Sequence, residues 1–336
     1  MILIDSIFVN ESGGKVLLDY LVENLENNKM EVHYLFDDRI KNNHPEILTN
    51  QVTYLKSGLY RRYEFYKKNK SRFSKVLCFG NLPPYIKMET EVFTYFHQPM
   101  YLNVSKEFSL IERLKFKLKI IILTQIAQNT NLWLVQTDLI KQKLHYKFHF
   151  NSESIKVIPF YPQFEQLESI SIREKNTYLY PSNASSHKNH KRLINGFCEF
   201  YDKNKVGKLI LTVSEYYTDV LKLIENKLSM NYPIENIGFV DRLTLQRKYL
   251  SSEFLIFPSL AESFGLGLIE AVECGCKVIG SDLPYTYEVC TPTLVFNPIE
   301  EDSIIGAFEN SLIGENLKLS MPVIQNNINQ IISLLK

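Results

Sequence analysis

Short apolar runs rich in β-branched and aromatic residues alternate along the chain with longer amphipathic stretches. This alternation is typical of parallel α/β layers. The runs predicted as strands are 2–9, 30–36, 52–55, 75–79, 92–96, 132–136 and 155–159 in the first half, and 177–181, 208–213, 236–240, 254–257, 277–280 and 293–296 in the second. Helical periodicity is clearest at 15–27, 190–203, 220–228 and 264–274. The pattern predicts two doubly wound units.

The pattern is interrupted between the two halves. Two prolines fall within residues 159–162, and a polar segment precedes the next strand, so we place a linker near 160–176. A length of 336 residues also favours two domains. We predict Rossmann-like domains at 1–162 and 163–320 that face a central cleft, with a helix at 321–336 packing back on the first. Open α/β sheets bind ligands at the carboxyl ends of their strands.

The composition is that of an ordinary globular protein, with 45% hydrophobic and 22% charged residues. Five cysteines, an odd number with no C-x2-C pair, favour a reducing compartment over a disulfide framework or a zinc knuckle. The first residues lack the basic region and cleavage site of a signal peptide, and no run of 18 uncharged apolar residues occurs. We therefore expect a cytoplasmic protein.

The charge is unevenly distributed, because residues 51–150 contain 17 Lys and Arg against 6 Asp and Glu. Segment 56–75 is basic with interleaved Tyr and Phe, and segment 113–123 is basic and then apolar. Both segments suit an anionic membrane surface or a lipid diphosphate, so we hypothesise peripheral association with the inner face of a membrane. The alternative is a solvated basic face. Nucleic acid is not an expected partner, because no recognition motif accompanies these residues.

Segment 254–290 contains the clearest chemistry. A buried strand ends at residues 258–259, a short loop carries Glu262, and a helix is predicted from near Phe264, with Leu266, Ile269 and Val272 on its packed face. The exposed amides and the dipole of a helix amino terminus form an anion site. Gly265 and Gly267 are expected to let a ligand approach the backbone. A phosphate is the predicted guest.

Two carboxylates lie at different distances from this helix start. Glu270 is about five residues into the helix, roughly 8 Å along its axis, which matches the reach from a diphosphate to its ribose hydroxyls. Glu262 precedes the helix and is expected to face the sugar. The alternative is that both are solvated charges around a helix start.

The Glu262 to Glu270 spacing, together with PSLAESFGLGLIEA and the following CGCKVIGSD, closely resembles the signature of the family 4 retaining glycosyltransferases, of group 1 type, with the two-domain B-type fold. The resemblance implies a nucleotide-diphosphate sugar donor held by Ser263, Phe264, Gly265 and Leu266. It also implies retention at the anomeric carbon, no cofactor and no metal. The implied acceptor is a glycan or a polyprenyl-diphosphate-linked glycan, as in surface polysaccharide, O-antigen or capsule synthesis.

Lys188 lies just before the helix predicted from residue 190 and resembles the family's cation for the diphosphate. A cation there offsets charge on the leaving nucleotide. The family's usual Gly-Arg pair is replaced by Pro181-Ser182-Asn183. Either Lys188 acts with neutral donors, or His187, His190 or Lys191 compensates. The alternative is an ordinary surface lysine.

Three further positions follow from the resemblance. Gly13 and Gly14 precede a helix, where the family has a Gly-rich turn against the donor, although a plain tight turn is the alternative. His97 follows a strand, where the family has a His near the reaction centre, although a lone His is often simply hydrogen-bonded. The nucleobase would lie against Phe239 or Val240.

Metal ligands are not predicted. No D-x-D or His/Asp cluster has suitable spacing, and Asp37-Asp38 is interpreted as a solvated turn at a strand end. Two other classes stay open: a nucleotide-sugar epimerase or phosphorylase of the same fold, and a catalytically inactive nucleotide-sugar binder. A nicotinamide-dependent oxidoreductase is disfavoured, because the first turn lacks the dinucleotide fingerprint.

Overall fold

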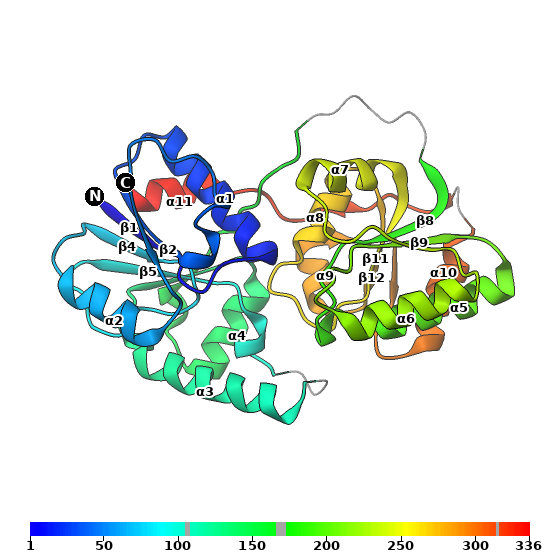
Figure 1. The fold of residues 1–336 in the computed structure, drawn as a ribbon, viewed down its shortest axis with the longest axis horizontal. Helices are drawn as coiled ribbons and strands as arrows, with labels where there is room; N and C mark the ends of the chain where they lie inside the picture. Colours follow the sequence, from blue (N-terminus) through cyan, green and yellow to red (C-terminus); the bar gives the residue numbers. More distant parts are fainter. Residues whose placement is uncertain (105–107, 166–172, 314–315) are drawn as a thin grey trace. The chain divides into compact units, whose positions relative to one another are not determined.

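The computed structural model describes residues 1–104, 108–165, 173–313 and 316–336. Contacts divide the chain into two compact units: Met1–Pro162 with Gln325–Lys336, and Gln163–Ile324. Part of the linker predicted at 160–176, namely 166–172, lies outside the described residues. Each unit has a parallel sheet between layers of helices (Figure 1). The α/β class with two Rossmann-like units is therefore confirmed.

The first unit contains a seven-stranded parallel sheet in the order β3-β2-β1-β4-β5-β6-β7. Its strands are β1 (Ile2–Asp5), β2 (Val32–Asp37), β3 (Gln51–Leu55), β4 (Lys75–Cys78), β5 (Glu91–Phe96), β6 (Leu132–Val135) and β7 (Ile155–Val157). Its helices are α1 (Ser12–Asn27), α2 (Leu59–Lys68), α3 (Leu110–Ile126), α4 (Asp138–Phe148) and α11 (Ile328–Leu335). Helices α1 and α11 cover one face of the sheet, and α2, α3 and α4 cover the other (Figure 1).

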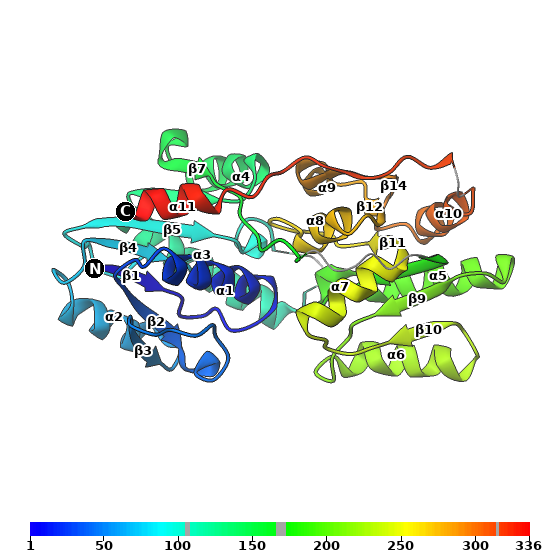
Figure 2. The same ribbon diagram turned by 90° about the horizontal axis from the view of Figure 1, so that it is seen from above.

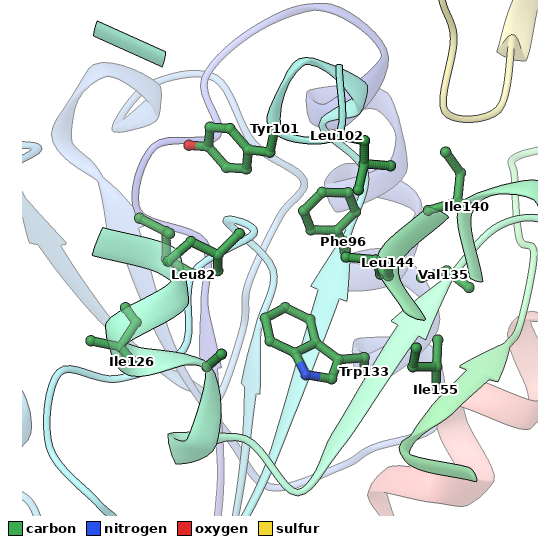
Figure 3. Close-up of a cluster of buried hydrophobic side chains, with 12 residues drawn as sticks. Leu82, Phe96, Tyr101, Leu102, Ile126, Trp133, Val135, Ile140, Leu144 and Ile155 are labelled. Atoms are coloured by element: carbon green, nitrogen blue, oxygen red, sulfur yellow. The ribbon is translucent and has the colours of Figure 1, made fainter. Parts of the chain in front are cut away.

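The hydrophobic spacing explains how these layers form. Leucines and valine recur every three or four residues along α1 and are buried, as expected for a helix with one apolar face. On the opposite face of the sheet, α3 and α4 cover a cluster that includes Trp133, Phe96 and Leu144 (Figure 3). Residues 2–9 were predicted as one strand, but β1 ends at Asp5, whose side chain accepts the amide of Ile7 at 3.2 Å.

The last segment of the chain returns to the first unit. Helix α11 buries four apolar side chains and contacts α1. The backbone N–H of Asn327 donates to the carbonyl of Pro159 at 2.8 Å, and the Asn326 amide donates to the Tyr20 hydroxyl at 2.9 Å. The return begins later than predicted, because β15 (Met321–Pro322), expected in the C-terminal helical segment, pairs antiparallel with β13 (Cys290–Thr291) of the second unit. Figure 2 shows this segment from above.

The second unit contains a six-stranded parallel sheet in the order β10-β9-β8-β11-β12-β14. Its strands are β8 (Glu174–Tyr180), β9 (Lys208–Leu211), β10 (Ile234–Asn236), β11 (Ser252–Phe257), β12 (Lys277–Ser281) and β14 (Leu294–Phe296). Its helices are α5 (His190–Asn204), α6 (Thr218–Ser229), α7 (Arg242–Ser251), α8 (Leu266–Glu273), α9 (Pro284–Val289) and α10 (Glu301–Ser311). Helices α5, α6 and α10 lie on one face, and α7 and α8 lie on the other (Figure 1).

Two local predictions are wrong. The strand expected at 236–240 ends at Asn236, because its side chain pairs with both backbone groups of Val213 and starts a loop. Asp37 is fully buried rather than solvated: it pairs with Arg39 at 2.7 Å and accepts the amide of Phe8 at 3.2 Å. Burial opposes ionisation of Asp37, but the bonds from Arg39 and Phe8 prevail and lower its pKa.

The five cysteines are free and buried. Cys276 donates its thiol to the Tyr249 carbonyl at 2.9 Å, and burial raises the pKa of Cys276 to about 11. These thiols therefore serve as packed core groups rather than as reactive ones.

Candidate functional site

The order of the strands in the second unit reverses between β8 and β11, which lie side by side. The loops that follow these two strands carry Lys188 and Glu262, two residues proposed from the sequence. Lys188 Nζ lies 2.5 Å from Glu262 Oε1, although the residues are 74 positions apart in the chain. Their side chains are 16% and 11% exposed, so water screens the pair only in part, although both side chains still reach solvent. Such a reversal is where open α/β sheets bind ligands.

The two loops are tied together by groups that sequence reasoning missed. The Tyr180 hydroxyl donates to the Lys188 carbonyl at 2.9 Å and lies 3.2 Å from Ser259 Oγ. The side chain of Asn189 donates to the carbonyls of Pro258 and Pro298 at 3.2 and 2.7 Å. Asn189 has a φ of +62°, a left-handed conformation that Asn tolerates better than most residues. These bonds hold Lys188 beside Glu262.

Helix α8 begins two residues later than predicted, because Gly265 has a φ of +84° and cannot be part of it. Phe264, just before it, is buried. Leu268, Ile269 and Val272 form the buried side of the helix, whereas Leu266 is only partly buried. The amides of the first turn therefore start at a left-handed glycine that follows Glu262 and Ser263.

Gly267 has a different role from the one predicted. A Cβ at this position would lie 3.3 Å from both the Phe257 ring and the Tyr249 hydroxyl. Gly267 therefore allows α8 to pack closely on β11 and α7, and the missing side chain does not face a ligand. A Cβ on Gly265 would lie 3.0 Å from the Leu268 side chain, a tight contact that adds to the strain that a φ of +84° imposes on residues other than glycine.

Glu270 is buried inside this unit. Arg242 Nη1 lies 2.6 Å from Glu270 Oε1, and the Tyr249 hydroxyl donates to Oε2 at 3.2 Å. Burial raises the pKa of Glu270, and Arg242 and Tyr249 oppose this shift. A buried carboxylate with two such partners is held in one orientation, and this argues against a solvated charge at a helix start.

Arg242 was not proposed from the sequence. It is the first residue of α7, and its guanidinium lies over the Phe164 ring, 4.2 Å from the centroid. Its only sequence signal was its place after the loop predicted to contact a nucleobase. In that loop Phe239 is 88% exposed and Val240 is partly buried. Arg242 therefore connects this loop with Glu270 on α8.

The histidines near Lys188 are neutral at pH 7. Burial lowers the pKa of His190 to about 3 and that of His187 to about 4, and the Lys188 charge adds to both shifts. Neither ring therefore supplies the positive charge of the missing arginine. Ser182 is partly buried, and its hydroxyl donates to the Asn183 carbonyl at 3.1 Å. Lys191 is exposed.

In the first unit, the structure brings together Gly14 and His97. A Cβ added to Gly14 would lie 2.9 Å from His97 Cε1, whereas one added to Gly13 would meet nothing within 4 Å. The His97 backbone amide donates to Asn81 Oδ1 at 2.6 Å, and its Nε2 lies 2.9 Å from the Phe79 carbonyl. Burial lowers the pKa of His97 to about 4, so this imidazole is neutral at pH 7. Asn81 was not foreseen.

Within the part of the chain that the structure describes, no group of three or more His, Cys, Asp or Glu side chains is arranged to hold a metal ion. In the same residues, no helix combines the length and apolar character needed to cross a bilayer.

Comparisons with known proteins find a family match within the second unit. Residues 163–319 match the family of glycosyl transferases group 1. Among curated proteins, the O-antigen chain mannosyltransferase RfbU of Salmonella typhimurium is 28% identical over 173 residues, which cover 51% of this chain and 48% of that protein. The matched segment thus spans about half the length of that relative.

Solved structures show the same fold over nearly the whole chain. Sucrose-phosphate synthase of Thermosynechococcus elongatus gives a TM-score of 0.72 at 15% identity, covering 93% of this chain and 90% of that one. HepE of Anabaena, solved with UDP and glucose, gives a TM-score of 0.65 at 12% identity, covering 93% and 89%. At these identities the likeness establishes the shared architecture.

Proposed function

We propose that the protein transfers a sugar from a nucleotide-diphosphate sugar to a glycan or a lipid-linked glycan. The proposal starts from the match of residues 163–319 to the glycosyl transferases group 1. The observation that carries the proposal is the Lys188–Glu262 pair at the β8/β11 reversal, next to the start of α8 and to the buried Glu270. A cation, a helix amino terminus and two carboxylates are the groups that a sugar nucleotide requires.

The diphosphate is assigned to the amides of residues 263–266 and to Lys188 Nζ. Glu270, fixed by Arg242 and Tyr249, would accept hydrogen bonds from the ribose hydroxyls. Phe239, exposed in the β10–α7 loop, would offer an aromatic surface to the base, with Val240 beside it. HepE, which shares the fold, was solved with UDP and glucose, and this supports a donor of the same class.

The transfer step needs charge stabilisation more than a protein nucleophile. The bond between the anomeric carbon and the diphosphate breaks, the acceptor oxygen bonds to that carbon on the same face, and the acceptor proton moves to the departing phosphate. Lys188 and the α8 amides would stabilise the leaving group without a divalent metal or a cofactor. Glu262 would bind the sugar. His97, as a neutral hydrogen-bond acceptor, and Gly13 and Gly14 stay predicted contacts of the donor sugar.

The acceptor is proposed to belong to cell-surface polysaccharide synthesis, because the mannosyltransferase relative acts on an O-antigen chain. A polyprenyl-diphosphate-linked glycan at the cytoplasmic face of a membrane would fit this role. The protein would then work in the cytoplasm, peripherally associated with that membrane.

A thermal-shift screen against a panel of nucleotide sugars tests donor binding, since a tight ligand raises the apparent stability by mass action. The correct donor should raise the melting temperature of the wild type and not that of Glu270→Gln. The control is Glu253→Gln, because Glu253 also pairs with a cation, Lys277, at 3.2 Å, and is 17% exposed away from the loops that follow β8 and β11. A panel without any stabilising nucleotide sugar would contradict the proposal.

Turnover distinguishes the classes that share this fold. Release of nucleoside diphosphate that requires an added glycan acceptor supports transfer. Conversion of the donor to an isomer without acceptor indicates an epimerase, and tight binding without either reaction indicates an inactive binder.

A further inference from the structure

Helix α3 carries an unusual outer surface. Leu110, Leu114, Leu118 and Ile121 recur every three or four residues and are 80%, 69%, 59% and 54% exposed; Ile111 beside them is 69% exposed. We call these five residues the α3 stripe. On its opposite, buried side, α3 contributes Leu123 and Ile126 to the cluster around Trp133. Figure 3 shows Ile126 in this cluster. Contiguous exposed apolar side chains of this kind mark an interaction surface.

Basic residues border the α3 stripe on both sides. At about 100° per residue, Arg113 and Lys117 project along one side of it, and Lys115 and Lys119 along the other. All four are partly or fully exposed. Only one acidic residue, Glu112, lies in the helix, and it is bound in the capping box with Ser109. An apolar strip between two basic borders is the pattern of helices that lie in the plane of an anionic membrane surface.

We propose that α3 docks the protein on an anionic lipid bilayer, with the α3 stripe inserted among the acyl chains and the four basic side chains on the lipid phosphates. The charge pattern selects this occupant over a second copy of the chain, because two identical stripes facing each other would bring their basic borders together. A bilayer with negative headgroups complements both the apolar strip and its borders.

The other basic segment contributes less than its sequence suggests. Arg62 of α2 is buried and pairs with Asp5 at 2.7 Å, so it does not reach a membrane. Lys70 lies 3.4 Å from Glu89 and is partly neutralised. Helix α2 lies on the same side of the sheet as α3 (Figure 1), and its exposed Lys67 and Lys68 add positive charge without a comparable apolar strip. Helix α3 is therefore the inserting element.

Co-sedimentation of the full chain with vesicles of phosphatidylglycerol and phosphatidylcholine tests the proposal. The Leu114→Gln, Leu118→Gln double variant should bind these vesicles more weakly, by about tenfold for each leucine. Lys115→Gln with Lys119→Gln should weaken binding by about fivefold for each lysine and reduce its salt sensitivity. Leu48→Gln with Leu319→Gln removes two leucines elsewhere that are at least as exposed on average, at 79% and 65%, and should leave vesicle binding unchanged.

An emission measurement locates the surface directly. Trp133 is the chain's single tryptophan and is buried, so it gives a constant background. A Leu114→Trp variant should shift its emission to the blue on adding anionic vesicles, and Leu48→Trp should not. Unchanged vesicle binding by the α3 leucine variant, at an unaltered melting temperature, would overturn the proposal. So would a wild type that ignores anionic vesicles, or a wild-type dimer that the leucine variant dissociates.

Binding to vesicles does not depend on catalysis. The α3 variants should keep their thermal shift with the nucleotide sugar, so a failure of donor binding and a failure of membrane docking are separate outcomes.

Discussion

Both units hold charged side chains among buried elements, but the charges are partnered in different ways. In the first unit, Arg62 donates to Asp5, to the carbonyls of Leu82 and Pro83, and to Cys78, while the Tyr66 hydroxyl donates to Asp5 at 2.5 Å. In the second unit, Lys188 and Glu262 contact each other at partly exposed positions.

The difference separates scaffold from site. The Arg62 guanidinium is 2% exposed and its donors are directed at fixed protein acceptors, so it joins α2 to β1 and to the loop after β4. Burial acts to lower the pKa of Arg62, but the Asp5 carboxylate prevails and raises it. The Lys188–Glu262 pair remains accessible to solvent. A bound phosphate can therefore take the place of Glu262 beside Lys188, and a bound sugar can take the place of Lys188 beside Glu262. A charged side chain therefore indicates a functional site only when its hydrogen-bond and ion-pair partners are also known.

Removing Arg62 should give the largest effect. Arg62→Ala leaves the Asp5 carboxylate buried without its cation. We expect this to lower the free energy of unfolding by about 3–5 kcal/mol. Urea unfolding followed by the fluorescence of Trp133, which lies in the first unit, measures it. Arg39→Ala, at an exposed arginine paired with Asp37, should cost less than half as much. An unchanged midpoint for Arg62→Ala would erase the contrast between the two units.

Removing Glu262 should spare stability and abolish most activity. Glu262→Gln is expected to lower kcat/KM by about 10²–10³-fold, as for other preorganised groups at a reacting centre. The melting temperature should stay near that of the wild type, because the pair is partly solvated. Steady-state release of nucleoside diphosphate measures the loss, and Glu253→Gln serves again as the control. Equal losses in both variants would place the chemistry elsewhere.

Acid should destabilise the second unit through His190. Its pKa is about 3 in the folded protein because of burial, against about 6.5 in the unfolded chain. As the pH falls below about 6.5, His190 is protonated in the unfolded state but not in the folded state. This difference lowers the free energy of unfolding by roughly 2 kcal/mol between about pH 7 and pH 5. His190→Gln should lose correspondingly less stability over that interval. Calorimetry at both pH values tests this, and an identical acid response would refute it.

Changing Arg242 should give the smallest effect and the most specific one. Arg242→Gln removes the charge that opposes the raised pKa of Glu270, so that pKa should rise further. Donor affinity should fall about tenfold near neutral pH and recover as the pH increases, because ionised Glu270 is the better acceptor of hydroxyl hydrogen bonds. Titration calorimetry across pH measures this. A uniform loss at every pH would indicate a packing role instead.

The sequence predicted the parts of the molecule that depend on local pattern. Alternating apolar runs located the strands of both sheets, and the Glu262 to Glu270 spacing pointed to the elements that follow β11. Lys188 was foreseen beside the same site, and the structure brings it to Glu262 because β8 and β11 are neighbours. The contact between Lys188 and Glu262 depends on the order of the strands in the sheet. Local hydrophobic periodicity does not specify that order.

Other features depended on contacts between distant residues. Tyr180 and Asn189, which hold the two loops together, look like ordinary strand and loop residues in the sequence. Arg62 appeared as one member of a basic segment, yet its acceptors come from β1 and from the loop after β4. Gly267 was assigned to a ligand because a glycine in a helix start has several uses, and only the nearby Phe257 and Tyr249 decide between them.

The placement of α11 bears on the order in which the protein is made. The first unit includes residues 325–336, so its hydrophobic layer beside α1 stays incomplete until the ribosome has synthesised the end of this chain. The second unit, continuous in sequence, has all its strands available earlier. The apolar surface of the nascent first unit therefore stays uncovered until residues 325–336 have been translated, after the whole of the second unit, and a chaperone would be most needed during this interval.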